Sequence, residues 1–164
     1  MTTPFQAGQR LTAAELDAIP MQVLPLAGSV TTVSTTPSTL IIATVAAATY
    51  YVEGVLECTI GATSTIPKIG FYGTATESAM LIAYSMFEES ATGENILGGK
   101  LTSMASNSNM SEAVASGAGV QVRFSGTITF SAGGTFIVEA GDTTSGDHYT
   151  VQAGSYMCLT QQQT

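Results

Sequence analysis

Short stretches of alternating apolar and polar residues fill the chain from about Ala27 onward, and glycine, serine and asparagine separate them. A period of two residues is typical of a β-strand that buries one face and exposes the other. In the clearest stretch, Tyr50 to Ile60, one face is apolar and the other carries Glu53 and Glu57, beside Tyr51 and Val55. Comparable strands are predicted at Val120–Phe124, Thr127–Phe130, Thr135–Glu139, Val151 and Tyr156–Leu159.

About eight short strands with regularly spaced turns and little helix predict an all-β domain. The expected architecture is a two-sheet antiparallel sandwich of the jelly-roll type. With 164 residues the chain is long enough for one domain with its own core. Two polar stretches, Glu88–Gly99 and Ser103–Gly119, are predicted to be loops.

The run from Met80 to Phe87 does not alternate and is apolar on both faces. In an antiparallel sheet this pattern indicates burial on both sides. One face of the run would belong to the core of the sandwich, and the other needs a second cover. A neighbouring subunit is the economical candidate, and Tyr84 in this run is a candidate interface residue.

The first 26 residues differ from the rest and are predicted to form an N-terminal arm, with the sandwich at residues 27–164. Thr12 and Glu15 have the spacing of a capping box, and Pro20 ends the short helix that begins at Thr12. An isolated helix of about two turns is marginal in water. It must therefore dock, either on its own domain or on another protein. The candidate anchoring residues are Phe5, Leu11, Leu16 and Ile19.

Charge is scarce in this chain, since 10% of its residues are charged against about 25% in typical domains. Such a surface suits a domain covered by copies of itself or held in a large assembly. It could equally reflect the composition of a host whose proteins are rich in alanine and glycine. The net charge is −8, and the four basic residues are scattered. We therefore expect neither nucleic-acid binding nor attraction to an anionic membrane.

No targeting segment is expected. The first residues lack the basic start and apolar core of a signal peptide. The longest apolar run, Leu40–Ala48, is too short to span a bilayer. Cys58 and Cys158 could form one disulfide in principle, but their strand-like surroundings favour buried, small apolar side chains.

Candidate catalytic chemistry is sparse. The single histidine, His148, cannot build a histidine-rich metal site, and no G-x-S-x-G turn supplies a nucleophile. The segment around Lys100 fails the spacing of a phosphate loop. Asp142 and Asp147 match no calcium loop and are expected to be solvent-facing. The chain is predicted to be no enzyme and to have no catalytic residues, metal or cofactor.

The C-terminal third, "VRFSGTITFSAGGTFIVEA…YTVQAGSYMCL", resembles the last strands of the tumour-necrosis-factor-like jelly roll found in bacteriophage virion proteins. "ATYYVEGVLEC" resembles a central strand of that family. The opening "PFQAGQRLTAAELDAI" resembles the N-terminal peptide of phage head-fibre, decoration and minor tail proteins, especially from phages of actinobacteria. The stretches cover about half of the chain, and Ser103–Gly119 does not align.

The resemblance implies a homotrimer in which the last strand lies near the threefold axis. Carried over by position, Tyr156 and Cys158 would face neighbouring subunits. Met157 and Leu159 would face the core of the sandwich.

The resulting hypothesis is a structural virion protein, a trimeric capsid decoration or head-fibre protein on the surface of a phage particle, made in the cytoplasm of the bacterial host. Its arm would bind the major capsid protein or another virion protein. One alternative is a tail-tip or receptor-binding protein, with a host surface glycan as a further partner. Another alternative, from a different class, is a glycan-binding domain or hydrolase with a site around Asp142, Asp147 and His148.

Overall fold

The computed structural model describes residues 21–32, 35–61, 67–90, 93–104, 119–142 and 148–162, and every regular element within them is a β-strand. The predicted all-β class is confirmed. The predicted helix Thr12–Ile19 lies outside the described residues, and so do the candidate anchoring residues Phe5, Leu11, Leu16 and Ile19. The division of the chain at residue 26 stays a prediction.

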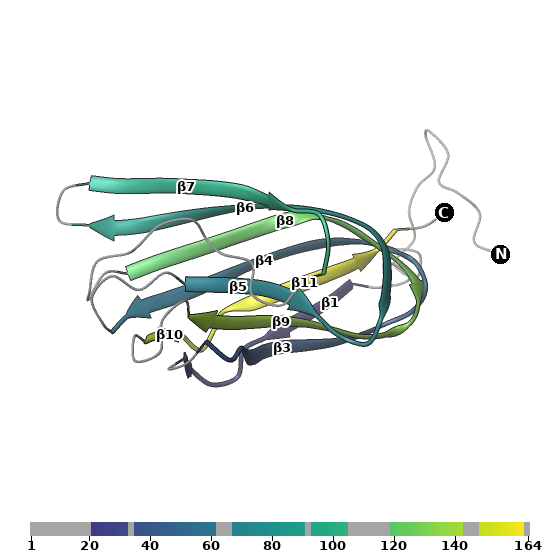
Figure 1. The fold of residues 1–164 in the computed structure, drawn as a ribbon, viewed down its shortest axis with the longest axis horizontal. Helices are drawn as coiled ribbons and strands as arrows, with labels where there is room; N and C mark the ends of the chain where they lie inside the picture. Colours follow the sequence, from purple (N-terminus) through teal and green to yellow (C-terminus); the bar gives the residue numbers. More distant parts are fainter. Residues whose placement is uncertain are drawn as a thin grey trace, which may run out of the picture.

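Six strands form the main path of a large antiparallel sheet, in the order β1-β11-β4-β8-β6-β7 (Figure 1). Two short strands extend it, because β10 pairs with β4 and β2 pairs with β10. The bounds in chain order are β1 Met21–Pro25, β2 Val30–Thr32, β4 Thr49–Ile60, β6 Thr76–Ser90, β7 Gly93–Leu101, β8 Gly119–Ala132, β10 Tyr149–Val151 and β11 Tyr156–Gln161.

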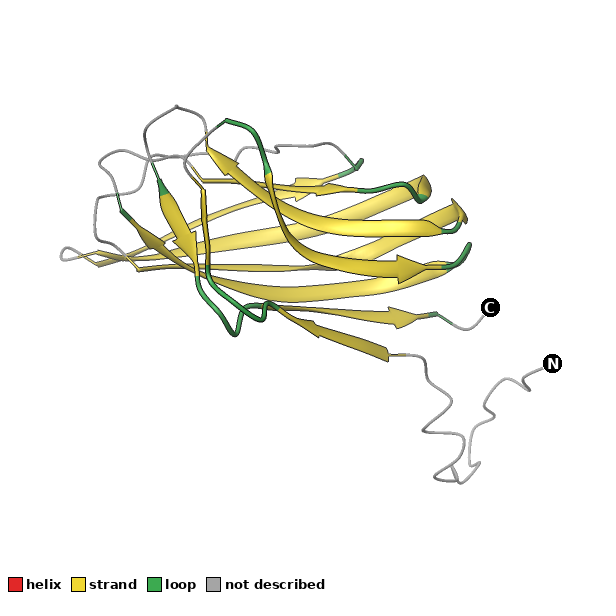
Figure 2. Ribbon diagram, turned by 90° about the horizontal axis from the view of Figure 1, so that it is seen from below, coloured by secondary structure: helices red, strands yellow, loops and turns green. Residues whose placement is uncertain are grey.

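A small sheet of three antiparallel strands faces the large one, with the order β3-β9-β5 (Ser38–Val45, Gly134–Asp142 and Pro67–Tyr72). Figure 2 shows the two layers edge-on. The chain passes back and forth between the sheets, since β3, β5 and β9 lie in one and β4, β6 and β11 in the other. The expected two-sheet antiparallel sandwich is confirmed, and this alternation is consistent with a jelly roll.

The core lies between the two sheets and is built from the faces that the sequence pattern marks as apolar. On β4 the alternation of buried and exposed positions runs from Tyr50 to Ile60. Aromatic rings join the layers: Phe71 stacks on Phe136 at 5.4 Å between centroids and meets Phe124 edge-on at 5.3 Å. Offset and edge-to-face pairs of this kind are favourable beyond the area they bury.

The prediction of a loop over Glu88–Gly99 is wrong. β6 continues to Ser90, and β7 begins at Gly93 and returns along it to Leu101. The physical reason is pairing with β8, which supplies backbone partners to β6 from Thr76 as far as Glu89. Backbone hydrogen bonds keep a polar segment extended when a long neighbouring strand is available. The other predicted loop, Ser103–Gly119, lies almost entirely outside the described residues.

The sandwich has two distinct ends. The chain enters β1 at Met21 and leaves β11 at Gln161, and the two strands are antiparallel neighbours, with Met21 opposite Thr160. We call this the entry end. β4 and β6 finish at the opposite end, where β8 also begins (Figure 1). We call that the far end.

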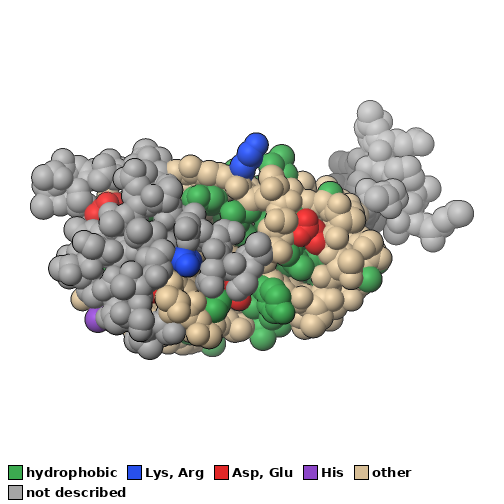
Figure 3. All heavy atoms as spheres, in the orientation of Figure 1, with side chains coloured by type: hydrophobic (Ala, Val, Ile, Leu, Met, Phe, Trp, Pro, Cys, Tyr) green, Lys and Arg blue, Asp and Glu red, His purple; other side chains and the backbone are tan. Residues whose placement is uncertain are grey.

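Among the described residues on the face shown in Figure 3, charged side chains are few and lie among polar and apolar ones. No group of three or more histidine, cysteine, aspartate or glutamate side chains suited to a metal ion occurs within the described ranges. No helix among the described residues is long and apolar enough to cross a membrane.

Candidate functional site: the outer face of the large sheet

The surface of the large sheet that points away from the core is the candidate functional site. We call it the outer face. Because side chains alternate along a strand, β4 presents Tyr51, Glu53, Val55, Glu57 and Thr59 there. The register aligns these positions with their neighbours on β11, β8 and β6, so the outer face consists of rows that cross several strands.

The rows near the entry end carry exposed apolar side chains, which are rare elsewhere on this protein. We call them the apolar patch. Met21, Tyr51 and Leu81 belong to one row, and they are 60%, 38% and 55% exposed. Val23 and Tyr156 continue the patch at 55% and 37% exposure. In the row of Met21, Tyr51 and Leu81, the side chains of Thr160 and Thr127 lie between the apolar ones. Exposed apolar groups gathered on one face in this way mark surfaces that another molecule covers.

The middle of the outer face is hollowed between strands. A cavity of about 320 Å³ lies there. Its walls include Tyr51 and Tyr156 from the apolar patch, Glu53, and Arg123 of β8.

Gly54, whose position on β4 faces the core, has no side chain, and a Cβ there would lie 2.3 Å from the Phe124 ring and 2.6 Å from the Tyr156 carbonyl oxygen. The close approach of β11 to β4 at Tyr156 therefore requires glycine.

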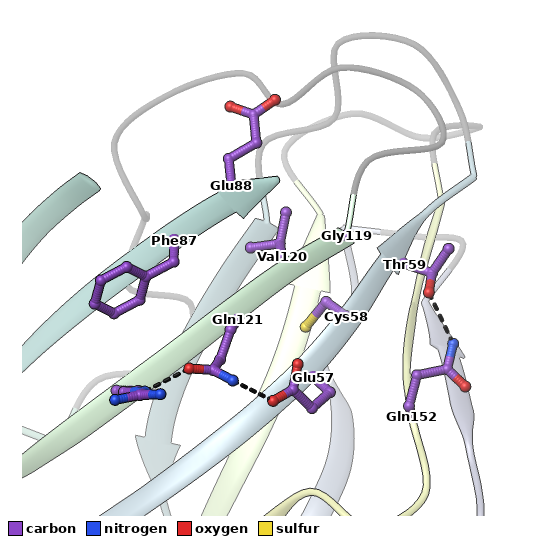
Figure 4. A pocket seen from close by; sticks show the side chains of 10 residues that line it. Glu57, Cys58, Thr59, Phe87, Glu88, Gly119, Val120, Gln121 and Gln152 are labelled. Atoms are coloured by element: carbon purple, nitrogen blue, oxygen red, sulfur yellow. Dashed lines mark hydrogen bonds between the residues drawn. The ribbon is translucent and has the colours of Figure 1, made fainter. Parts of the chain in front are cut away.

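A row closer to the far end is mostly polar and lines a second cavity of about 620 Å³, which we call the far hollow. The row runs from Gln152, directly after β10, to Glu57 on β4, Gln121 on β8 and Phe87 on β6. Gln121 donates from its amide to Glu57 at 2.5 Å, and Arg123 donates to the Gln121 carbonyl oxygen. Figure 4 shows the Gln121 side chain directed toward Glu57.

The predicted interface residues do not share one surface. Tyr156 lies in the apolar patch, and Cys158 stands on the same face between Val23 and Glu53. Tyr84 is half-buried on the opposite, core-facing side of β6, with its ring against Gly99. The part of the prediction that places Met157 and Leu159 in the core agrees with the structure, where both are fully buried. Roles for Tyr84, Tyr156 and Cys158 in subunit contact stay predictions.

The two cysteines are free thiols in different environments. Cys58 is buried in the core, and this burial, with the nearby Glu57 carboxylate as a smaller cause, raises its pKa to about 12. Cys158 is 9% exposed. Burial raises the pKa of Cys158 as well, and the Glu53 carboxylate adds to the effect.

Cys58 is expected to resist alkylation in the folded protein. A thiol with a pKa of about 12 is ionised to about one part in 10,000 at pH 8, and only the thiolate reacts. Iodoacetamide at pH 8 followed by mass spectrometry should leave Cys58 unmodified, whereas both cysteines should be labelled in urea. Labelling of Cys58 at equal rates with and without urea would contradict its burial.

The prediction of solvent-facing carboxylates near the C-terminus is wrong for Asp142. Its side chain is fully buried at the end of β9. It lies near Tyr149, which is also fully buried and donates its hydroxyl to the Lys68 carbonyl oxygen at 3.0 Å. Burial raises the pKa of Tyr149, with the Cys58 and Asp142 charges as smaller causes. His148 is half-buried over Gly61, and Asp147 lies outside the described residues.

The far hollow escaped the sequence interpretation. The alternation at Val120–Phe124 does show that Gln121 and Arg123 face outward, as Glu57 does on β4. What the sequence lacks is the register that brings Gln152, Glu57, Gln121 and Phe87 into one row. Glu57, Phe87 and Gln121 are 30 or more positions apart in the sequence, and no local pattern encodes that pairing.

No family model matches the chain. No curated protein matches it either. One similar solved structure is that of the Eiger tumour necrosis factor from S. frugiperda, with 11% sequence identity and a TM-score of 0.39, over 88% of this chain and 94% of that chain.

Proposed function

We propose that this protein is a non-enzymatic, trimeric structural protein on the surface of a phage particle, in the manner of a capsid decoration or head-fibre protein. The observation that carries the proposal is the apolar patch. Tyr51, Leu81 and Tyr156 stand exposed on a sheet whose other face already packs in the core. A stable soluble protein covers such a patch, and a closed oligomer of identical subunits does so most simply.

Further copies of the same chain fit the patch better than a charged partner does. Its central rows are filled by small side chains, Ser125 and Ala83, beside the single carboxylate of Glu53. The phage resemblance of the C-terminal strands implies the same threefold arrangement, with Tyr156 near the axis.

The course of the chain supports attachment through the N-terminal arm. Residues 1–20 lead into β1 at the entry end, beside the apolar patch. In a trimer built on that patch, three arms would leave from one end of the assembly. Three weak anchors bound together hold far more tightly than one, because the second and third bind at a high effective concentration.

A variant that begins at Met21 is expected to fold and to be missing from particles of the phage that encodes it. The reason is that residues 1–20 supply the anchor and none of the described strands. Occupancy is measured by quantitative mass spectrometry of purified particles, with the full-length protein as the control. Unchanged occupancy of the shortened protein would contradict the anchoring role.

A tail-tip or receptor-binding role is the second candidate. It is favoured by the far hollow, which lies toward the end of the sandwich opposite the one at which the chain enters β1, and which would point away from the particle. Immunogold labelling of tails rather than heads would decide for it.

A further inference from the structure

We propose that the far hollow binds a neutral, hydroxyl-rich ligand, a short oligosaccharide. The volume of about 620 Å³ is within the usual range of small-molecule sites, roughly 300–1,000 Å³. The proposal concerns the isolated protein and holds wherever the protein sits on a particle. It places binding away from Asp142 and His148.

The lining of the far hollow offers planar polar groups in one row. Gln152, Glu57 and Gln121 present amide or carboxylate groups, and Arg123 adds a guanidinium. Arg123 donates to Gln121 through its Nε atom, and this bond does not use its terminal N–H groups. Each amide both donates and accepts, which matches sugar hydroxyls, because a hydroxyl also does both.

These side chains are held in place before any ligand arrives. The Gln152 amide donates to the Thr59 hydroxyl at 3.1 Å and accepts from Ser29 at 3.2 Å. Behind the amide, the buried Ser155 hydroxyl accepts from the Glu57 backbone N–H at 3.0 Å and donates to the Gln152 backbone carbonyl oxygen at 2.8 Å. A binding group whose orientation is already fixed loses less conformational entropy when a ligand binds.

Phe87 gives the far hollow an apolar side. The Arg123 guanidinium lies over its ring, 5.4 Å from the centroid, which fixes both groups. The Phe87 ring, with the guanidinium against one of its faces, supplies apolar surface at the edge of the polar row. A sugar ring offers matching surfaces, because its C–H groups can pack on the apolar side of the far hollow while the hydroxyls at its rim meet the polar row.

The charges in the far hollow argue against an ionic ligand. The polar row holds one cationic side chain, Arg123, and one carboxylate, that of Glu57. Glu88 also lines the far hollow, but its side chain is buried and directed away from the row (Figure 4). An anion would meet the Glu57 carboxylate, and a cation would meet the Arg123 guanidinium. An apolar ligand would strip water from the polar row without replacing its hydrogen bonds. A neutral ligand with many hydroxyls can form hydrogen bonds with the amides, the carboxylate and the guanidinium of the polar row.

The test is binding of the full-length protein to an immobilised set of neutral and sialylated oligosaccharides, followed by calorimetric titration with the strongest neutral binder. At least one neutral oligosaccharide is expected to bind. Gln121→Ala should weaken this binding by about tenfold, since it removes the amide that links Glu57 and Arg123 in the middle of the polar row. Gln162→Ala makes the same substitution at the entry end and should leave the affinity within about twofold.

Phe87→Leu serves as a second variant that keeps an apolar side chain and removes the flat ring, and it should also weaken binding by about tenfold. Thermal melts by circular dichroism verify that each variant is folded. The proposal is overturned if no neutral oligosaccharide binds, if only sialylated ones bind, or if binding survives both substitutions. Sugar binding is measured on the isolated protein. A negative result would therefore not bear on the virion role, which is tested separately by particle occupancy.

Discussion

Tyr156→Ala is expected to dissociate the trimer while leaving the sandwich folded. The Tyr156 side chain is 37% exposed on the apolar patch and lines the cavity between β11 and β8. Removing a tyrosine from the centre of an interface typically costs about 2 kcal/mol or more, which is a roughly thirtyfold weaker contact. Sedimentation velocity over a range of micromolar concentrations should show a trimer for the parent protein and smaller species for the variant.

The matched control is Tyr72→Ala, which makes the same change on the outer side of the small sheet. Tyr72 is 54% exposed, more than Tyr156, so a general effect of losing an exposed tyrosine would appear in both variants. Only Tyr156→Ala should change the concentration dependence. A parent protein that sediments as a monomer, or two variants that sediment alike, would contradict the assignment of the apolar patch to subunit contact.

Gly126→Ala is expected to cause a large loss of stability. Gly126 lies in β8 between Val52 of β4 and Ile82 of β6, in the middle of the large sheet. A Cβ at this position would lie 2.0 Å from the Leu81 carbonyl oxygen and 2.6 Å from the Ile82 Cα atom. Both are backbone atoms, so relief of the clash requires β6 to move away from β8.

The free energy of unfolding should fall by about 4 kcal/mol or more, a large part of the 5–15 kcal/mol typical of a domain. Urea unfolding at one fixed protein concentration measures it, because oligomer formation makes apparent stability depend on concentration. Gly28→Ala is the control, since no atom lies within 4 Å of a Cβ there. A loss below about 1 kcal/mol for Gly126→Ala would mean that the strands are not packed as described.

The strands with a clear period of two were predictable because their pattern is local. On β4 the buried positions Val52, Leu56 and Ile60 are the ones that the alternation marks. The hairpin of β6 and β7 was not predictable in this way. Glu88 and Gly99 look like loop residues in a short window, yet β8 lies alongside and gives β6 its backbone partners.

In the candidate site, too, only the features that depend on a local pattern were predictable. The alternation alone indicates that Tyr156 and Cys158 face away from Met157 and Leu159. It does not indicate that Tyr84 points into the sandwich. The run around Tyr84 is apolar on both sides, so the sequence contains no signal for the choice of face, and pairing with β8 decides it.

The sequence by itself determined the all-β class, the inward faces of the regular strands and the absence of a basic surface, because each depends on residue type and short spacing. The tertiary structure alone decided which side chains meet across strands. The row from Gln152 through Glu57 and Gln121 to Phe87 exists only in one register, and a shift by one residue would turn these side chains into the core. Register is fixed by the whole core, so no single segment encodes it.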